Sequence, residues 1–415
     1  MKRVNGKAER DLHIVEAVVR RHGPISRARI HELTGIRPSA TSQLVRRLLK
    51  EGRLLEAGVE EGRLGRKGVL LELNEAYASA LGIEFDDETV TAGVTDLHPR
   101  IRHKVTARTL LEEGTEGLIR QLLDVARRAI REAAVPAASL VGIGVADPGL
   151  VDSQRGVTVT SSTMPFWKQV PLKEIFEREF NTPVQVETRT RAKAVAEHEE
   201  DLADGAGSMV YVDYGSGIGA GLYVDGRLLY GQGSAAGEFG HTHVTEDGPI
   251  CNCGSFGCLE AFAGIRAVEA RLRRIIAEGG QTDVLDMADG DPARITGWMV
   301  FQAASRGDKA ASSIVAEVGR YLALGIANLV NLFNPGVVVL DATLGEAGQE
   351  LLEQISGIVR RKALRESAAQ AVIRYARVRE SAGVLGVARI ALAKHFEIPA
   401  FKPPPFLLEE RGYGK

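Results

Sequence analysis

The sequence predicts an α/β protein in which an N-terminal winged helix-turn-helix precedes a larger body of two lobes with a cysteine-rich loop. Residues 1–74 carry seven more positive than negative charges, whereas the rest of the chain carries nine more negative charges. From about residue 79, short β-rich runs alternate with helical stretches, as in α/β domains. All three cysteines of the 415-residue chain lie within eight residues, at Cys251, Cys253 and Cys258.

The predicted DNA-binding module, residues 1–75, begins with two helices. Apolar residues recur at helical spacing over residues 8–21, and Gly23-Pro24 ends that run. Ser26 is expected to cap a second, short helix, which Gly35 terminates. A third helix is expected to open with a cap at Pro38-Ser39. Its inward-facing apolar residues are predicted to be Ala40, Leu44 and Leu48. Two strand-like runs and a glycine-rich tip then complete a winged helix-turn-helix, at residues 53–59 and 68–74.

The outer faces of this module carry side chains that suit DNA. Ser, Gln and Arg can hydrogen-bond base edges and phosphates, and a basic wing tip can enter a narrow minor groove. The predicted contacts are Arg37, Ser39, Ser42, Gln43, Arg46, Arg66 and Lys67. We therefore expect a double-stranded DNA operator as the partner, because fold pattern, basic excess and wing agree. The alternative is a small helical or protein-docking domain with a solvated polar face.

The body is expected to span residues 76–397 and to form two α/β lobes. Strand-like runs such as "ASALGIEF" and "SLVGIGVADPG" alternate with helical stretches, which include residues 115–133, 310–331 and 345–367. The Pro-rich tail, residues 398–415, is expected to be an extended strap or a loose end. The apolar runs fall short of the ~18 residues that span a bilayer, and no signal-peptide h-region is present at the N-terminus. We therefore expect a cytoplasmic protein without a membrane segment.

The cysteines have the spacing C-x-C-x4-C, which is typical of a metal site. A tetrahedral zinc requires a fourth ligand, and an imidazole suits it. His241 and His243 lie just upstream, and the spacing alone does not choose between them. Three free thiols are the alternative, although clustered exposed thiols oxidise or capture metal. We expect one structural zinc per chain, because four protein ligands leave no position for a catalytic water.

The segment from Gly237 to Glu260, "GEFGHTHVTEDGPICNCGSFGCLE", resembles the signature of the ROK family (repressors, open reading frames and kinases). The stretch "VADPGLVDSQRGVTVTSSTMPFWKQVPL" is similar to the family's PG-x-VD segment, and "YGSGIGAGLYVDGRLLYG" resembles its glycine-rich hairpin. The resemblance covers about residues 79–397, and the winged helix resembles the N-terminal module of the family's transcriptional regulators. It implies a two-lobed body of the actin and hexokinase type.

The resemblance also implies roles for individual residues. It selects His241 as the fourth zinc ligand, beside the three cysteines. It places Glu238, His241 and Glu260 at positions that contact sugar hydroxyls in the family, and zinc would fix the orientation of the His241 ring. The predicted effector-binding residues are Thr163, Arg189, Glu238, His241 and Glu260.

The positions that carry kinase chemistry in the family are altered in this chain. The family's base is the Asp of V-E-N-D-A-N-A, but the matching stretch "VETRTRA" has Arg189 there, and arginine cannot accept a proton. Asp86 and Asp87 stand at the two glycines of the phosphate loop D-I-G-G-T, and Asp341 replaces a glycine of a later loop. Carboxylates there would repel a triphosphate. We therefore predict a protein that is not an enzyme.

The predicted function is a transcriptional regulator, a repressor of carbohydrate-related genes, controlled by a sugar in a catalytically inactive ROK domain. The alternative is an ATP-dependent ROK sugar kinase with an added DNA-binding domain. A regulator that senses a protein partner is a third possibility. A homodimer or homotetramer is expected, because two winged helices must reach major grooves roughly 34–36 Å apart.

Two arginines suggest an acidic sugar derivative as effector. Arg189 and Arg191 stand where the family has neutral or acidic residues beside the sugar. A guanidinium pairs well with a carboxylate or phosphate. The alternative is that Arg189 pairs internally with Glu187 or Glu238.

Overall fold

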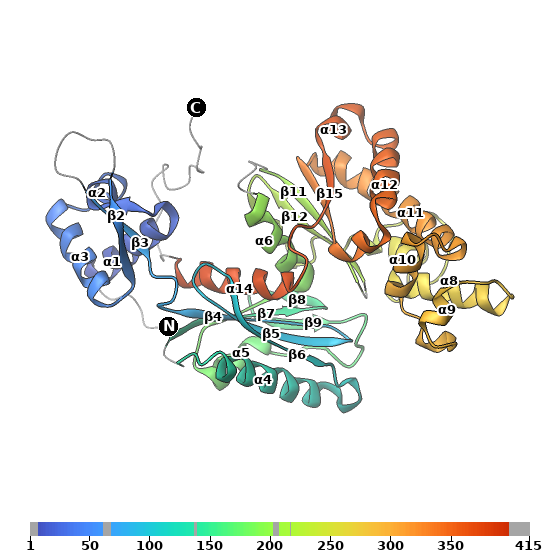
Figure 1. The fold of residues 1–415 in the computed structure, drawn as a ribbon, viewed down its shortest axis with the longest axis horizontal. Coiled ribbons are helices and arrows are strands. Elements are labelled where there is room, and N and C mark those ends of the chain that lie inside the picture. Colours follow the sequence, from blue (N-terminus) through green and yellow to red (C-terminus); the bar gives the residue numbers. More distant parts are fainter. Residues whose placement is uncertain (1–6, 61–67, 137–138, 202–206, 216, 398–415) are drawn as a thin grey trace.

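The chain folds into a winged helix followed by two α/β lobes (Figure 1). This computed structural model describes residues 7–60, 68–136, 139–201, 207–215 and 217–397. The predicted DNA contacts Arg66 and Lys67 lie outside the described residues, as does the predicted tail 398–415. The predicted fold class is confirmed.

The winged helix contains three helices and a three-stranded sheet in the order β1-β3-β2. Its elements are α1 (Lys7–His22), β1 (Ile25–Ser26), α2 (Arg27–Thr34), α3 (Pro38–Lys50), β2 (Leu54–Val59) and β3 (Val69–Leu73). Ser26 caps α2 by accepting a hydrogen bond from the amide of Arg29, and Gly35 ends the helix with a left-handed φ of 68°. Both predicted helix signals are confirmed.

Helix α3 begins one residue earlier than predicted, and its buried face is broader than predicted: Leu48 is buried and Leu44 packs against the core as expected, but Thr41 and Val45 are buried as well. Arg37 is its N-cap and Pro38 its first residue, so the predicted cap at Pro38-Ser39 is wrong. The fully buried residues are Thr41, Val45 and Leu48, whereas Ala40 and Leu44 are only half-buried. A polar residue is tolerated in the core because the Thr41 hydroxyl donates to the carbonyls of Ile36 and Arg37.

Lobe 1 is a five-stranded sheet in the order β10-β7-β4-β5-β6, accompanied by the two-stranded sheet β8-β9. The strands are β4 (Ser79–Phe85), β5 (Thr89–Thr95), β6 (Ile101–Arg108), β7 (Leu140–Asp147), β8 (Leu150–Asp152), β9 (Val157–Thr160) and β10 (Val184–Thr188). Helices α4 (Gly114–Glu132) and α5 (Leu172–Phe180) pack their apolar residues on this sheet. Trp167 is fully buried in the same core.

Lobe 2 is a second five-stranded sheet in the order β13-β12-β11-β14-β15. Its strands are β11 (Met209–Tyr214), β12 (Ile218–Val224), β13 (Arg227–Leu228), β14 (Val337–Leu340) and β15 (Val372–Tyr375). Its helices are α7 (Leu259–Ala263), α8 (Ile265–Ala277), α9 (Val284–Met287), α10 (Gly297–Ser305), α11 (Lys309–Phe333), α12 (Gln349–Lys362) and α13 (Arg365–Gln370). Helix α11 is long and apolar enough to cross a membrane, but 61% of its apolar window is buried, as in the core helix of a globular body.

Two helices connect the three units. Helix α6 (Arg189–Asp201) follows the last strand of lobe 1 and packs on the sheet of lobe 2. Helix α14 (Ala382–His395), which is absent from the sequence-based expectations, lies against β4, β7 and α6 (Figure 1). A Cβ on Gly386 would lie 1.7 Å from the carbonyl oxygen of Ala192 in α6, so this close approach requires glycine. The other end of α14 packs into the winged-helix core through Ala388 and Leu392.

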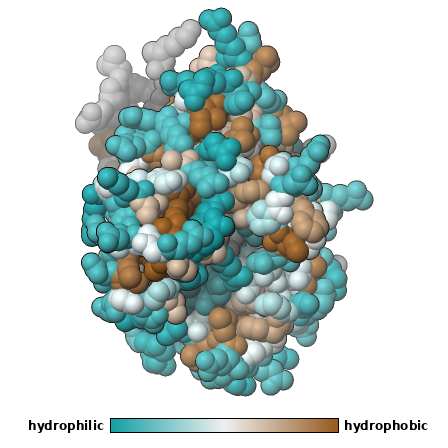
Figure 2. Space-filling model, turned by 90° about the vertical axis from the view of Figure 1, so that its right-hand side faces the viewer, coloured by the Kyte–Doolittle hydropathy of each residue, from teal (hydrophilic) through white to brown (hydrophobic). Residues whose placement is uncertain are grey.

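The surface of the molecule is shown from the lobe 2 side in Figure 2. Hydrophilic side chains cover most of this face, and hydrophobic patches lie among them. The most exposed large apolar residues of the part of lobe 2 that the structure describes include Ile250, Leu332, Leu364 and Val372.

Candidate functional site

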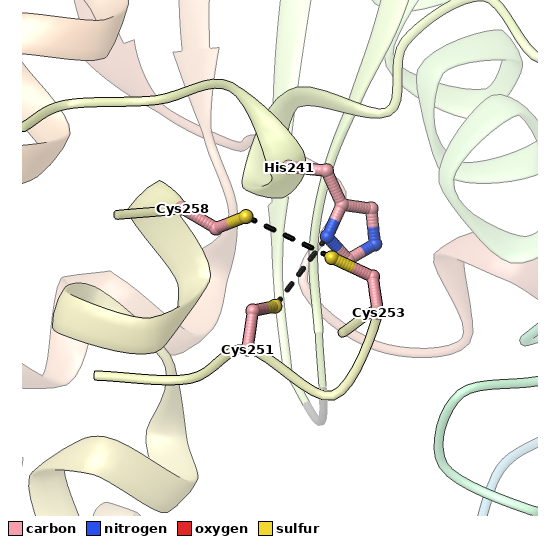
Figure 3. A group of neighbouring side chains, drawn as sticks. All are labelled: His241, Cys251, Cys253 and Cys258. Carbon is pink, nitrogen blue, oxygen red and sulfur yellow. Dashed lines mark hydrogen bonds between the residues drawn. The ribbon is translucent and has the colours of Figure 1, made fainter. Parts of the chain in front are cut away.

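Four side chains converge at the predicted metal site in lobe 2 (Figure 3). The ligand atoms of His241, Cys251, Cys253 and Cys258 all lie within 4.8 Å of one another. The Sγ of Cys251 is 3.6 Å from Nδ1 of His241, and the Sγ atoms of Cys253 and Cys258 are 3.7 Å apart. Zinc–sulfur bonds of about 2.3 Å imply sulfur–sulfur edges of roughly 3.7 Å in a tetrahedron. The cluster therefore has the size of a tetrahedral zinc site.

Local backbone structure positions these four ligands. The cysteine turn closes through a hydrogen bond from the amide of Cys251 to the carbonyl of Ser255, and Gly254 takes a φ of 88° within it. Cys258 is the N-cap residue of α7, and His241 ends the 3-10 helix η4 (Phe239–His241). The turn thus directs the thiols of Cys251 and Cys253 toward two fixed ligands.

The second histidine of the sequence motif lies outside the cluster. Nε2 of His243 is 3.1 Å from the hydroxyl of Ser255, and its backbone pairs with that of Cys258. The structure therefore places His241, and not His243, beside the three cysteines.

Three of the predicted effector residues lie in or beside the Cys3His cluster: His241 is one of its members, and Glu238 and Glu260 lie near it. The carbonyl of Glu238 accepts a hydrogen bond from the amide of His241, and Oε2 of Glu260 accepts one from the amide of Ile218. A Cβ on Gly240 would lie 3.1 Å from the same Glu260 oxygen, so the backbone between Glu238 and His241 passes close to Glu260. Burial raises the pKa of Glu238, and His241 and Arg191 partly offset this effect.

The His241 ring presents one nitrogen to the cysteines and the other away from them. Its Nδ1 faces the sulfurs, and its second ring nitrogen points away from them (Figure 3). A metal on Nδ1 would fix the ring and leave Nε2 to interact on the other side.

Thr163 lies on the other lobe. It is half-buried in the segment between β9 and α5, and its hydroxyl is 3.2 Å from that of Ser161. The predicted effector residues are thus divided between lobe 1, which supplies Thr163, and lobe 2, which supplies Glu238, His241 and Glu260.

Arg189 is buried and paired within the protein. Its Nη1 donates a hydrogen bond of 2.9 Å to Asp86, and its Nε lies 3.5 Å from Asp213. The sequence-based alternative expected Arg189 to pair with Glu187 or Glu238, so its observed partners are different residues. Glu187 instead accepts a hydrogen bond of 2.6 Å from Nε of Arg191.

Lys193, one helical turn after Arg189, extends this network. Its ammonium donates to Asp213 at 2.8 Å and to Asp341 at 2.9 Å, and Asp341 also accepts a hydrogen bond from Tyr211. Burial alone would raise the pKa of Asp213, but Lys193 and Arg189 hold it below its ordinary value. In the sequence, Asp86, Arg189 and Asp341 are three separate departures from the family's pattern. In the structure they belong to one ionic network.

The outer face of α3 presents the predicted DNA contacts to solvent. Arg37, Ser39, Gln43 and Arg46 are exposed, and Ser42 is half-buried. The Nε of Arg46 donates only to the carbonyl of Ser42 in its own helix. The next residue, Arg47, differs because it pairs with Glu9 and Glu51.

Known proteins resemble this chain over most of its length. The xylose repressor of Caldicellulosiruptor bescii is 27% identical over 377 residues, which are 91% of this chain and 94% of that protein. The crystal structure of a ROK family transcriptional regulator, a homologue of the E. coli MLC protein, matches with a TM-score of 0.76 and 24% identity. That match covers 94% of this chain and 97% of the other.

A kinase also matches, but over a smaller part of this chain. The ROK family glucokinase of Streptomyces griseus, solved with glucose and AMPPNP, has a TM-score of 0.68 and 26% identity. It covers 76% of this chain and 99% of the glucokinase. The glucokinase match therefore leaves about a quarter of this chain uncovered, whereas the regulator match covers nearly all of it.

The fold and the site together define a class of protein. Its members have an N-terminal winged helix followed by a two-lobed α/β body of the sugar-kinase type, with a Cys3His cluster in the second lobe. The ROK family profile matches residues 80–394. The chain belongs to the ROK family.

Proposed function

We propose that this protein is a cytoplasmic DNA-binding repressor of carbohydrate-related genes, whose ROK body senses a sugar. The observation that carries the proposal is the packing of α14. Helix α14 packs on α6, whose first turn contains Arg189 and Arg191. The C-terminal half of α14 is part of the winged-helix core. The similarity to a protein named xylose repressor over 91% of the chain supports the same conclusion.

The proposed mechanism follows from the division of the effector residues between the lobes. A sugar that contacts Thr163 on lobe 1 and Glu238 on lobe 2 would draw the lobes together. Because α6 and α14 are packed against each other, such a movement would reach the winged helix. In a homodimer or homotetramer it would change the separation of two winged helices that have to reach half-sites roughly 34–36 Å apart. A coupling of ~1–3 kcal/mol would change DNA affinity roughly 5- to 150-fold.

We propose zinc, one ion per chain, as the metal of the Cys3His cluster. Thiolate and imidazole ligands at tetrahedral spacing suit zinc, and four protein ligands leave no open position. The ion would hold the cysteine turn and orient His241. Its role is therefore structural.

DNA binding is tested by fluorescence anisotropy with a palindromic operator selected from a random DNA pool. Arg46→Ala is expected to weaken operator binding by ~1–3 kcal/mol if Arg46 reads a base. If Arg46 contacts phosphate, the loss is expected to be equal for all sequences and to reduce the salt dependence. Xylose and glucose, added to the wild-type complex, test release by a sugar.

Arg47→Ala is the matched control for this experiment. Arg47 neighbours Arg46 on α3 but is paired with Glu9 and Glu51, so its loss is expected to change operator affinity less. Unchanged operator affinity after deletion of residues 1–74 would contradict the assignment of the DNA-binding domain.

We propose more specifically that the effector is an acidic sugar derivative and that it contacts Arg191. Arg189 is occupied by Asp86, whereas Nη2 of the buried Arg191 has no hydrogen-bond partner among the described residues. In calorimetric titrations, glucuronate is expected to bind roughly 10- to 150-fold more tightly than glucose, because a hydrogen bond to a charged group contributes ~1.5–3 kcal/mol. Arg191→Gln should remove this preference. Equal binding of both sugars by the wild type would leave a neutral sugar as the effector.

We propose further that the ROK body is catalytically inactive. Arg189 stands where the family has its base, and its guanidinium is held by Asp86. No ATP-dependent phosphorylation of glucose or xylose is expected in a coupled assay. Turnover that Glu238→Ala abolishes would instead support the alternative function, a sugar kinase with an added DNA-binding domain.

A further inference from the structure

Two neighbouring carboxylates of lobe 1 reach cations that are anchored to lobe 2. Asp86 and Asp87 lie in the turn between β4 and β5. Asp86 accepts a hydrogen bond of 2.9 Å from Arg189, and Asp87 lies 3.3 Å from a guanidinium nitrogen of Arg266 in α8. Both contacts join residues far apart in the sequence. The Asp87 contact reaches α8 of lobe 2 directly, whereas the Asp86 contact reaches lobe 2 through Arg189, the first residue of α6, which lies beside Asp213.

The Arg189 side chain also forms an ion pair with lobe 2. The Nε of Arg189 lies 3.5 Å from Asp213 at the end of β11. Asp213 also accepts hydrogen bonds from Thr190 and Lys193, which follow Arg189 on α6. The α6 side of the contact is therefore fixed to the lobe 2 sheet, and Asp86 approaches it from the other lobe.

The turn in lobe 1 is equally well defined. Oδ1 of Asp86 accepts hydrogen bonds from the amides of Glu88 and Thr89, at 2.9 and 2.8 Å. Its second oxygen, Oδ2, is the atom that meets Arg189. One carboxylate thus shapes the turn with one oxygen and contacts the opposite lobe with the other.

We propose that Asp86 and Asp87 form an interlobe clasp, which holds the two lobes at a fixed angle in the absence of effector. The pair of Asp86 with Arg189 is the strong part, because the Arg189 side chain is only 9% exposed and charges out of water are weakly screened. The pair of Asp87 with Arg266, whose side chain is 51% exposed, is the weak and salt-sensitive part. The clasp extends the proposed function, since the angle that it sets is the starting point for an effector-driven movement.

The test is hydrogen exchange and small-angle scattering of the full chain, without DNA or sugar. Asp86→Asn with Asp87→Asn removes both charges, while an asparagine oxygen can still accept the two turn amides. Amides of residues 85–90 and 265–270 are expected to exchange about 10-fold faster, which corresponds to 1.4 kcal/mol. The radius of gyration is expected to increase as the lobes separate.

The matched control removes two charges from a pair of contacts within lobe 1. Arg127 binds both Asp124 and Glu179, so Asp124→Asn with Glu179→Gln changes the net charge equally without touching the interlobe contact. This control is expected to leave both measurements at the wild-type values. Exchange and radius of gyration that are unchanged in the Asp86 and Asp87 double variant would overturn the proposal.

Two features keep the test decisive. Exchange in α1 is the check for a general loss of folding. If exchange in α1 also rises in the double variant, the single variant Asp87→Asn is measured instead. A smaller rise is then expected at the same two segments, and the absence of a rise there would overturn the clasp. Because neither DNA nor sugar is present, failure of the clasp is distinguishable from failure of the proposed repressor function.

Discussion

Cys258→Ser is expected to abolish stoichiometric metal binding and to destabilise lobe 2 by several kcal/mol, because the binding energy of a structural zinc, about 10–16 kcal/mol in zinc-finger peptides, is folding energy. Cys258 is fully buried, and it is both a cluster ligand and the N-cap residue of α7. Elemental analysis of protein purified without chelator should give about one zinc per wild-type chain. Thermal unfolding measures the loss of stability.

His243→Ala is the matched control for the metal site. It removes a neighbouring histidine that lies outside the cluster, so zinc content is expected to stay near one per chain. Near-zero metal in the wild type, with three thiols that react freely in the folded protein, would contradict the zinc site. Equal zinc loss in both variants would contradict the choice of His241 over His243.

Lys193→Met is expected to destabilise the protein by about 3–5 kcal/mol, the usual cost of removing one partner from a buried ion pair. The Lys193 ammonium forms ion pairs with both Asp213 and Asp341, and both aspartates are buried. Its loss therefore removes an ion-pair partner from two buried carboxylates. At ~2–4 °C per kcal/mol for a unit of about 150–250 residues, which is the size of lobe 2, the melting temperature of that lobe should fall by roughly 10 °C. Lys104→Met, which removes an exposed pair with Glu380, should change it little.

The pH dependence of stability offers a second measurement on the same network. The pKa of Asp213 is held below its ordinary value by Lys193 and Arg189, so its ion pairs stabilise the fold above the pKa of the unfolded state. That stability is lost as the pH falls through the folded-state pKa. Lys193→Met should therefore lose less stability on acidification than the wild type. A parallel pH profile for the two proteins would contradict this account of the network.

Much of the fold could be predicted from local sequence signals. Ser26 and Gly35 bound α2 because a hydroxyl cap and a left-handed glycine act within one turn of backbone. The register of α3 was harder to predict, because Thr41 reads as a polar surface residue. Its hydroxyl donates to two backbone carbonyls, so Thr41 and Val45 join the predicted Leu48 in the core, while Leu44 packs against that core and is only half-buried. Helix α14 was missed because its mostly small and apolar residues lack the one-sided pattern of a surface helix.

The amino-acid sequence alone shows which residue types stand at the candidate metal site and at the positions of the family's kinase residues, because each is a matter of residue chemistry at one position. Three cysteines and a nearby histidine supply the thiolate and imidazole ligands that suit zinc, whatever the position of their loop in the fold. An arginine stays protonated, so it cannot act as a base. The spacing of the motif left His241 and His243 open, and only the folded chain places His241 with the cysteines and brings Asp86, Arg189 and Asp341 into one ionic network. Asp86 and Arg189 are 103 residues apart, and Lys193 and Asp341 are 148. Contacts over such separations depend on how two sheets and α6 pack together, which no local pattern contains.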